Sequence, residues 1–181
     1  MGRLAYLRLM SIRSILTAPD RRLKAVSAPV EKVDAEIRRL TDDMIETMYA
    51  ADGMGLAAIQ IGVPKRIIVM DLDQKSGRKN PRVFIDPRII WLSDDLVKFE
   101  EGCLSVPDIW EEVERPARIS AEHLERDGKT VRLDAEGLLA TCLQHEMDHL
   151  DGVLFIDHLS RLKRSMALRR LQKAKRLKEA G

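Results

Sequence analysis

The sequence is poor in cysteine and contains no long apolar run. Only two of its 181 residues are cysteines, Cys103 and Cys142, whereas small secreted folds held by disulfides usually carry more. A reducing cytoplasm is therefore the expected setting, and each thiol needs its own explanation. No apolar stretch approaches the roughly 18 residues that a membrane-spanning helix requires, so we expect no membrane partner.

The amino terminus lacks the features of a secretory signal. Residues 1–9, MGRLAYLRL, are short, apolar and basic, without a long apolar region or a small-residue cleavage site. Met10 could be the natural start, which would make residues 1–9 an upstream extension or a remnant of cloning. The chain has no repeats and no Pro/Gly-rich linker, so residues 1–181 are predicted to form one domain. We expect a monomer.

The small net charge of +2 hides an uneven distribution. Residues 160–181 contain nine Lys or Arg side chains and one acidic residue, so this end carries +8 and the rest carries −6. A charge run is usually a solvated helix face, which is our interpretation for half of these residues. A basic C-terminal helix over residues 159–181 would also suit the phosphate backbone of a nucleic acid.

Hydrophobic spacing predicts both helices and strands. Residues 34–51 have the period of an amphipathic helix with Asp34 as its N-cap, and this period returns in residues 136–150 and from about Leu159. Short apolar runs predict strands at 67–72, 83–90, 96–99, 119–124 and 130–133, the last two joined by a turn at residues 126–128. This order predicts an α+β fold, with mainly antiparallel strands packed around a central helix and a C-terminal helix.

Two histidines lie four residues apart in the segment QHEMDH at residues 144–149. On a helix, His145 and His149 share one face and can bind one metal ion, and Glu146 can then reach a metal-bound water. The alternative is that both histidines are structural residues, buried and hydrogen-bonded. The helical period before them and Gly152 after them favour a metal site. A divalent metal lowers the pKa of its water to about 7. The motif therefore predicts hydrolysis of an amide-like bond, with Glu146 as general acid and base.

Two cysteines compete to be the third metal ligand. Cys142 lies three residues before His145, on nearly the same helix face, whereas Cys103 belongs to the separate segment EGCLS at residues 101–105. A ligand from a separate segment would enclose the metal between that segment and the helix. We therefore favour Cys103 as the ligand and Cys142 as a packing residue beside the site. Either thiol could instead be a small buried hydrophobe. One cysteine and two histidines suit Fe²⁺, Zn²⁺, Co²⁺ or Ni²⁺.

Three blocks in a fixed order make the chain resemble the bacterial peptide deformylases. These blocks are GMGLAAIQ at residues 53–60, EGCLS at 101–105 and QHEMDH at 144–149. The resemblance extends from about Ile12 to Lys178. It implies removal of the formyl group from the initiator methionine of new polypeptides, with release of formate. It also implies Fe²⁺ as the usual metal, zinc with poorer activity, and a C-terminal helix that contacts the ribosome near the exit tunnel.

The resemblance also implies roles for individual residues. The metal ligands would be Cys103, His145 and His149, with Glu146 as the general acid and base. The oxyanion donors would be the Gln60 side-chain amide and the Leu104 backbone N–H. The peptide would bind as an added strand, and its methionine would enter an apolar pocket. The residues implied for these two contacts are Gly53, Met54, Gly55, Phe99, Gly102, Leu138 and Cys142, although ordinary core is an equally good interpretation of Phe99 and Leu138.

Five further side chains carry weaker hypotheses. Glu101 and Arg115 are expected to pair and brace the groove wall. Trp110 either borders the peptide groove or is a surface residue without a role. His123 and His158 are interpreted as structural or surface residues.

Two other functions compete with the hydrolysis of formyl-methionine. A zincin-type endopeptidase shares the histidine motif but takes a third His or Glu ligand downstream, where this chain offers only His158. An RNA-binding protein with a closed structural metal site would leave Glu146 and the Gln60 block without a purpose. Both alternatives therefore account for less of the sequence.

Overall fold

The computed structural model describes residues 11–179, so the predicted extension at residues 1–9 lies outside the described part. The described residues form three α-helices, seven strands and four short 3-10 helices. The helices are α1 (Ala35–Ala50), α2 (Gly137–Leu150) and α3 (Arg161–Glu179). The strands are β1 (Gly55–Ala57), β2 (Ile67–Met70), β3 (Arg82–Leu92), β4 (Leu96–Cys103), β5 (Val106–Pro116), β6 (Arg118–Leu124) and β7 (Thr130–Glu136).

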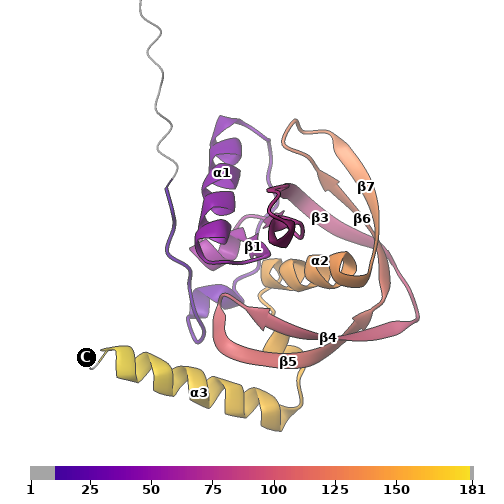
Figure 1. Ribbon diagram of the computed structural model, residues 1–181. Coiled ribbons are helices and arrows are strands. Elements are labelled where there is room, and N and C mark those ends of the chain that lie inside the picture. Colours follow the sequence, from indigo (N-terminus) through magenta and orange to yellow (C-terminus); the bar gives the residue numbers. More distant parts are fainter. Residues whose placement is uncertain (1–10, 180–181) are drawn as a thin grey trace, which may run out of the picture.

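The strands form two antiparallel sheets around one helix. The larger sheet has the order β1-β2-β3-β6-β7, and β4 pairs with β5 in a separate two-stranded sheet. In Figure 1, α2 lies at the centre, with the β4–β5 sheet below it and the larger sheet beside it. The predicted α+β fold with mainly antiparallel strands, a central helix and a C-terminal helix is confirmed.

Strand β2 shows how the larger sheet separates two helices. Its four residues are all buried, and successive side chains point to opposite faces of a strand. Ile68 packs in the cluster that contains the α2 residues Ala140, Leu143, Met147 and Leu150. Ile67 and Val69 pack in a second cluster with α1 residues. One face of α2 is therefore fixed against the sheet, which leaves its other face available for the site.

The predicted helix start and hairpin are both present. The Asp34 carboxylate accepts hydrogen bonds from the backbone N–H groups of Glu36 and Ile37, at 2.9 and 3.0 Å. It thereby satisfies two of the unpaired donors at the start of α1. Strands β6 and β7 form the expected hairpin, with Leu124 opposite Thr130.

Two elements differ from the sequence-based expectation. No strand was predicted between residues 104 and 118, yet β5 occupies most of that segment. Its prolines, Pro107 and Pro116, and its acidic residues hide the strand pattern, because both residue types are depleted in strands.

Helix α3 also departs from expectation. Leu162 and Met166 were expected to share an apolar stripe with Leu168 and Leu171, but they are 71% and 61% exposed, whereas Leu171 is buried.

Within residues 11–179, no helix combines the length and the apolar character needed to span a membrane.

Candidate metal centre and substrate groove

Cys103, His145 and His149 meet where the end of β4 reaches α2. Their ligand atoms all lie within 4.8 Å of one another, and Cys103 Sγ is 3.2 Å from His149 Nε2. In the part of the chain that the structure describes, this is the one group of His, Cys, Asp and Glu side chains close enough to hold a metal ion. Cys142 does not belong to the group. The fold thus brings together the three residues favoured as ligands.

The chemistry of this donor set fits a divalent transition metal. Burial raises the pKa of the Cys103 thiol, but the charges and hydrogen bonds of His149 and His145 outweigh burial and lower that pKa to about 5. The sulfur is therefore a thiolate at neutral pH, which is the form that binds metals. A thiolate with two imidazoles matches metal sites that keep a fourth position for water or substrate.

Glu146 lies beside the three candidate metal ligands and has a carboxylate oxygen without a hydrogen-bond partner among the described residues. Its side chain is buried, and the unpaired oxygen is Oε2. Burial raises the pKa of this carboxyl group. On the opposite wall, a Cβ atom at Gly55 would collide with the Glu146 carboxylate, so the absence of a side chain at Gly55 makes room for it. A buried carboxylate with a raised pKa is suited to general acid–base chemistry.

The two expected oxyanion donors lie next to Cys103. Gln60 is buried in a 3-10 helix (Ala58–Ile61), where its Oε1 atom accepts a hydrogen bond of 2.8 Å from the Ala57 N–H. Its Nε2 atom donates to Ser105 Oγ at 3.0 Å and lies 3.6 Å from Cys103 Sγ. Leu104 follows Cys103 directly, in the two-residue turn between β4 and β5. The Gln60 amide is therefore fixed with its N–H groups at the metal centre.

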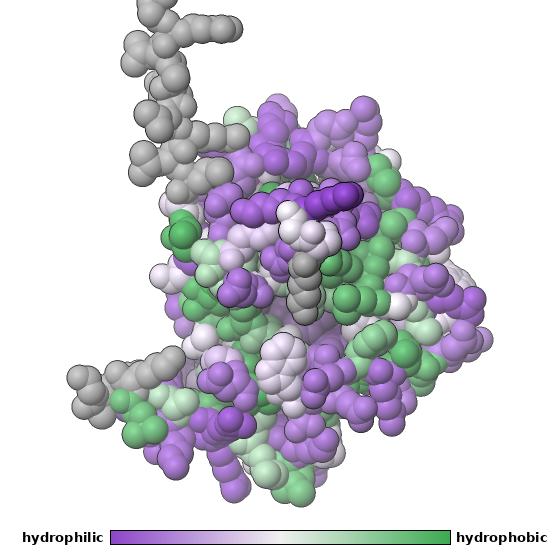
Figure 2. Space-filling model, viewed as in Figure 1, coloured by the Kyte–Doolittle hydropathy of each residue, from purple (hydrophilic) through white to green (hydrophobic). Residues whose placement is uncertain are grey.

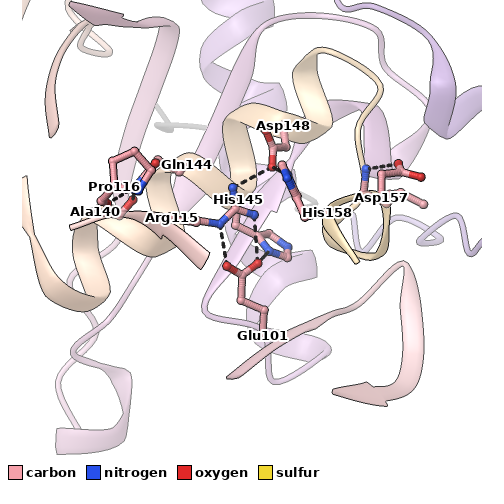
Figure 3. A network of polar contacts seen from close by, with 10 residues as sticks. Glu101, Arg115, Pro116, Ala140, Gln144, His145, Asp148, Asp157 and His158 are labelled. Atoms are coloured by element: carbon pink, nitrogen blue, oxygen red, sulfur yellow. Dashed lines mark hydrogen bonds and ion pairs between the residues drawn. The ribbon is translucent and has the colours of Figure 1, made fainter. Parts of the chain in front are cut away.

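A network of ion pairs fixes the orientation of the His145 ring through its Nδ1 atom (Figure 3). His145 Nδ1 lies 2.7 Å from Glu101 Oε2, and Arg115 Nε donates to Glu101 Oε1 at 2.6 Å. The expected pairing of Glu101 with Arg115 is confirmed. Because the carboxylate can only accept, Nδ1 of His145 is the donor and Nε2 is left for a metal. Breaking a buried pair of this kind typically costs about 3–5 kcal/mol.

The network extends to two residues that sequence analysis did not place at the site. Arg115 Nη1 donates to Asp148 Oδ2 at 2.8 Å, and His158 Nε2 lies 2.7 Å from the same oxygen. The only signal for Asp148 was its position three residues after His145 on one helix. His158 was interpreted as structural or surface. His123 is buried against the ring of Phe84, with 4.6 Å between ring centroids, as expected for a structural residue.

A cavity of about 390 Å³ opens beside the metal centre. In Figure 2 this face of the molecule is hollowed near its middle, where hydrophobic and hydrophilic side chains meet. Trp110 lines the cavity and is 63% exposed. Its indole ring lies so close to Gly102 that a side chain at that position would collide with it. All seven residues expected to contact substrate line the same cavity as Cys103 and Glu146, namely Gly53, Met54, Gly55, Phe99, Gly102, Leu138 and Cys142.

The edges of two strands border this cavity. β1 is one of the two edge strands of the larger sheet, and β4 has a hydrogen-bonded neighbour, β5, on one side only. Residues from both strands or their flanks line the cavity. A thiolate and imidazole cluster, a buried carboxylate and a groove between open strand edges together define a metal-dependent hydrolase with room for an extended peptide.

Comparison with known proteins gives a consistent result. The sequence pattern of the polypeptide deformylase family matches residues 12–165. The peptide deformylase of Phenylobacterium zucineum is 63% identical over 164 residues, which cover 91% of this chain and 97% of the relative. The peptide deformylase of Rhizobium meliloti is 56% identical over 171 residues, or 94% and 98% of the two chains. The chain therefore belongs to the polypeptide deformylase family.

Solved structures agree with this assignment. A crystal structure of a Legionella pneumophila peptide deformylase superposes with a TM-score of 0.87 at 46% identity and covers 94% of this chain and 99% of its own. The Ehrlichia chaffeensis peptide deformylase in complex with actinonin gives a TM-score of 0.88 at 46% identity, over 92% and 99% of the two chains. Members of this family are metal-dependent enzymes that remove the N-formyl group from nascent polypeptides.

Proposed function

We propose that this chain hydrolyses the formyl group from the N-terminal formyl-methionine of new polypeptides and releases formate. Cys103, His145 and His149 are the metal ligands in this proposal, and Glu146 is the general acid and base. The observation that carries it is the meeting of three ligand atoms within 4.8 Å, beside a buried carboxylate and at the wall of a peptide-sized groove.

The proposed metal is Fe²⁺, with Zn²⁺, Ni²⁺ or Co²⁺ as possible occupants of purified protein. The donor set supports a divalent metal of this group, because imidazole and thiolate ligands suit all four ions. When bound, such a metal supplies Lewis-acid activation of water. The structure contributes the thiolate of Cys103 and the ring of His145, which Glu101 holds in one orientation.

Glu146 moves the proton in this scheme. Its unpartnered Oε2 atom can accept a proton from the attacking water and then deliver it to the leaving nitrogen. As the formyl carbon is attacked, negative charge grows on its oxygen. The Gln60 side-chain amide and the Leu104 backbone N–H are the proposed donors to this oxygen, and they would stabilise the transition state more than the substrate.

Replacement of Gln60 by alanine tests the oxyanion assignment. We expect Gln60→Ala to lower kcat by about 10²–10³-fold, the usual loss for one oxyanion donor, while KM changes little. Steady-state formate release from a formyl-Met peptide is the measurement. Because Gln60 also bonds Ser105 and the Ala57 N–H, the metal content of the variant should be measured alongside. A variant with full metal and near-normal kcat would remove Gln60 from the reaction.

The peptide is proposed to bind as an added strand between β1 and β4. Backbone groups of Met54, Gly55 and Gly102 would pair with it, and Gly53 allows close approach of the chain. This mode reads the main chain and tolerates varied sequence after the methionine. The apolar pocket for the methionine side chain would be formed by Met54, Phe99, Leu138 and Cys142, which all line the cavity.

We further propose that the chain works in the cytoplasm as a single-domain monomer. Two features support parts of this. Helix α2 contacts both sheets, as a single domain requires. Both thiols are free, as a reducing compartment requires.

Helix α3 is the proposed contact with ribosomal RNA. It is fixed to the body by Lys163 with Glu111 at 2.6 Å and by Arg164 with Asp157 at 2.7 Å. Most of its other basic side chains are exposed, namely Arg161, Arg169, Arg170, Lys173, Lys175 and Arg176. Such a row of cations suits the negative phosphates of RNA.

Neutralising the exposed cations tests this contact. We expect Arg169→Gln, Arg170→Gln and Lys173→Gln together to weaken binding to ribosomes and to lower the slope of log K against log salt by about one per lost phosphate contact. Co-sedimentation with ribosomes at several salt concentrations measures both. Formate release from a short free peptide should stay unchanged. Binding that is insensitive to salt, or equal in the variant, would contradict the contact.

A further inference from the structure

Thr141 lies in the wall of the cavity and belongs to the face of α2 that points away from the sheet. Its spacing from Leu138 and His145 puts all three side chains on one stripe of the helix, and all three line the cavity. The opposite stripe, with Ala140 and Leu143, packs in the core. Thr141 itself is only 3% exposed. It is therefore a buried residue of the groove wall.

The hydroxyl group of Thr141 has no partner. The two buried threonines of α1 return their hydroxyls to their own helix, Thr41 to the Arg38 carbonyl at 2.8 Å and Thr47 to the Asp43 carbonyl at 2.7 Å. Thr141 makes no such bond, and its Oγ1 atom is buried without a hydrogen-bond partner among the described residues. An unsatisfied buried hydroxyl is destabilising, and valine would fill the same volume without that cost.

Several apolar side chains share the cavity wall with this hydroxyl. Phe99, Val106 and Leu138 line the same cavity. Cys142 follows Thr141 on the helix, and burial, followed by the charge of Glu146, raises the pKa of its thiol to about 12, so it is neutral and a weak donor. The Thr141 hydroxyl is thus the stronger donor on this wall. A substrate side chain that fits here is apolar in shape and offers one acceptor atom.

The methionine thioether has this character, because its sulfur is a weak hydrogen-bond acceptor in an otherwise apolar side chain. A hydrocarbon side chain of the same length, such as norleucine, offers no acceptor and would leave the hydroxyl unpaired. A threonine in a helix has two accessible χ1 rotamers, so its hydroxyl can turn toward a ligand in the cavity.

We propose that Thr141 is a specificity-determining residue, whose hydroxyl donates a hydrogen bond to the thioether sulfur of the substrate methionine. This inference rests on the proposed function, because it assumes that the methionine side chain enters this cavity. It explains why a polar residue is buried here without a partner: the partner arrives with the substrate. Thr141 would thus favour a substrate side chain with a thioether sulfur over one with a methylene group at the same position.

The test compares two peptides and three proteins. The peptides are formyl-Met-Ala-Ser and formyl-norleucine-Ala-Ser, and the proteins are the wild type, Thr141→Val and Thr141→Ser. The valine variant keeps the shape and loses the hydroxyl, whereas the serine variant keeps the hydroxyl. We expect the ratio of kcat/KM for the two peptides to fall about two- to tenfold in Thr141→Val, the worth of one neutral hydrogen bond. The ratio should be largely retained in Thr141→Ser.

Thermal unfolding of the peptide-free proteins gives a second readout. Because Thr141 lacks a partner in the free protein, Thr141→Val should unfold at the same or a higher temperature than the wild type. An unchanged peptide ratio in Thr141→Val, an equal loss in Thr141→Ser, or a lower unfolding temperature of Thr141→Val would each overturn the inference. If the wild type released formate from neither peptide, the proposed function itself would fail, which is a distinguishable result.

Discussion

Glu146→Ala is expected to slow formate release severely while the protein keeps its metal. The side chain lies at the metal centre but is not one of the three grouped ligands, so its removal should spare metal binding. Its carboxylate is the proposed carrier of the proton from water to the leaving nitrogen. General acid–base catalysis contributes about 10²–10⁴-fold to a rate, and we expect a loss of kcat at the upper end of that range. Formate release and metal analysis on the same sample measure both quantities.

The pH profile sharpens this prediction. Burial raises the pKa of Glu146 above its ordinary value, so activity should fall as pH drops through that raised pKa and the carboxylate becomes protonated. Glu146→Gln should match Glu146→Ala in rate, because an amide cannot accept the proton. Glu125→Ala, which removes an exposed carboxylate at the β6–β7 turn, is the matched control and should behave as wild type. Substantial turnover by metal-loaded Glu146→Ala would refute the assignment.

Cys103→Ser is expected to lose or loosen the metal, and Cys142→Ser to retain it. The two thiols differ in charge at neutral pH. The pKa of Cys103 is lowered to about 5, against the effect of burial, by His149 and His145. Burial instead raises the pKa of Cys142 to about 12. A serine hydroxyl at position 103 stays neutral and cannot replace the thiolate as an anionic ligand.

The two serine variants control for each other, because both exchange one partly buried sulfur for oxygen. Metal stoichiometry after anaerobic purification, followed by the rate of metal loss to a chelator, distinguishes them. We expect Cys103→Ser to hold well under one metal ion per chain and to release formate slowly. Retention of metal by Cys103→Ser together with its loss from Cys142→Ser would transfer the third ligand to α2.

Much of this architecture is local and could be predicted from sequence. Asp34 caps α1 as expected, because an N-cap contacts backbone only two and three residues away. The two histidines of α2 share a face because four residues make about one helical turn. The β6–β7 hairpin follows from a turn sequence of three residues. Each of these features depends on neighbours in the chain.

The unpredicted features depend on distant contacts. The hydrogen bond from His145 to Glu101 joins residues 44 positions apart, and no helical or strand period reports it. The pairing of Glu101 with Arg115 was expected, but its continuation to Asp148 and His158 requires the three-dimensional fold. The missing hydrogen bond of Thr141 is likewise invisible in sequence, because threonine often bonds its own helix.

The most direct test of the central claim measures formate and metal in one sample. The claim is that a metal held by Cys103, His145 and His149 is needed for hydrolysis of formyl-methionine. Anaerobically purified protein should contain about one metal ion per chain and release formate from formyl-Met-Ala-Ser. Chelation should remove metal and activity together, and Fe²⁺ should restore both. Undiminished formate release by metal-free protein, or no release by protein loaded with Fe²⁺, would contradict the account.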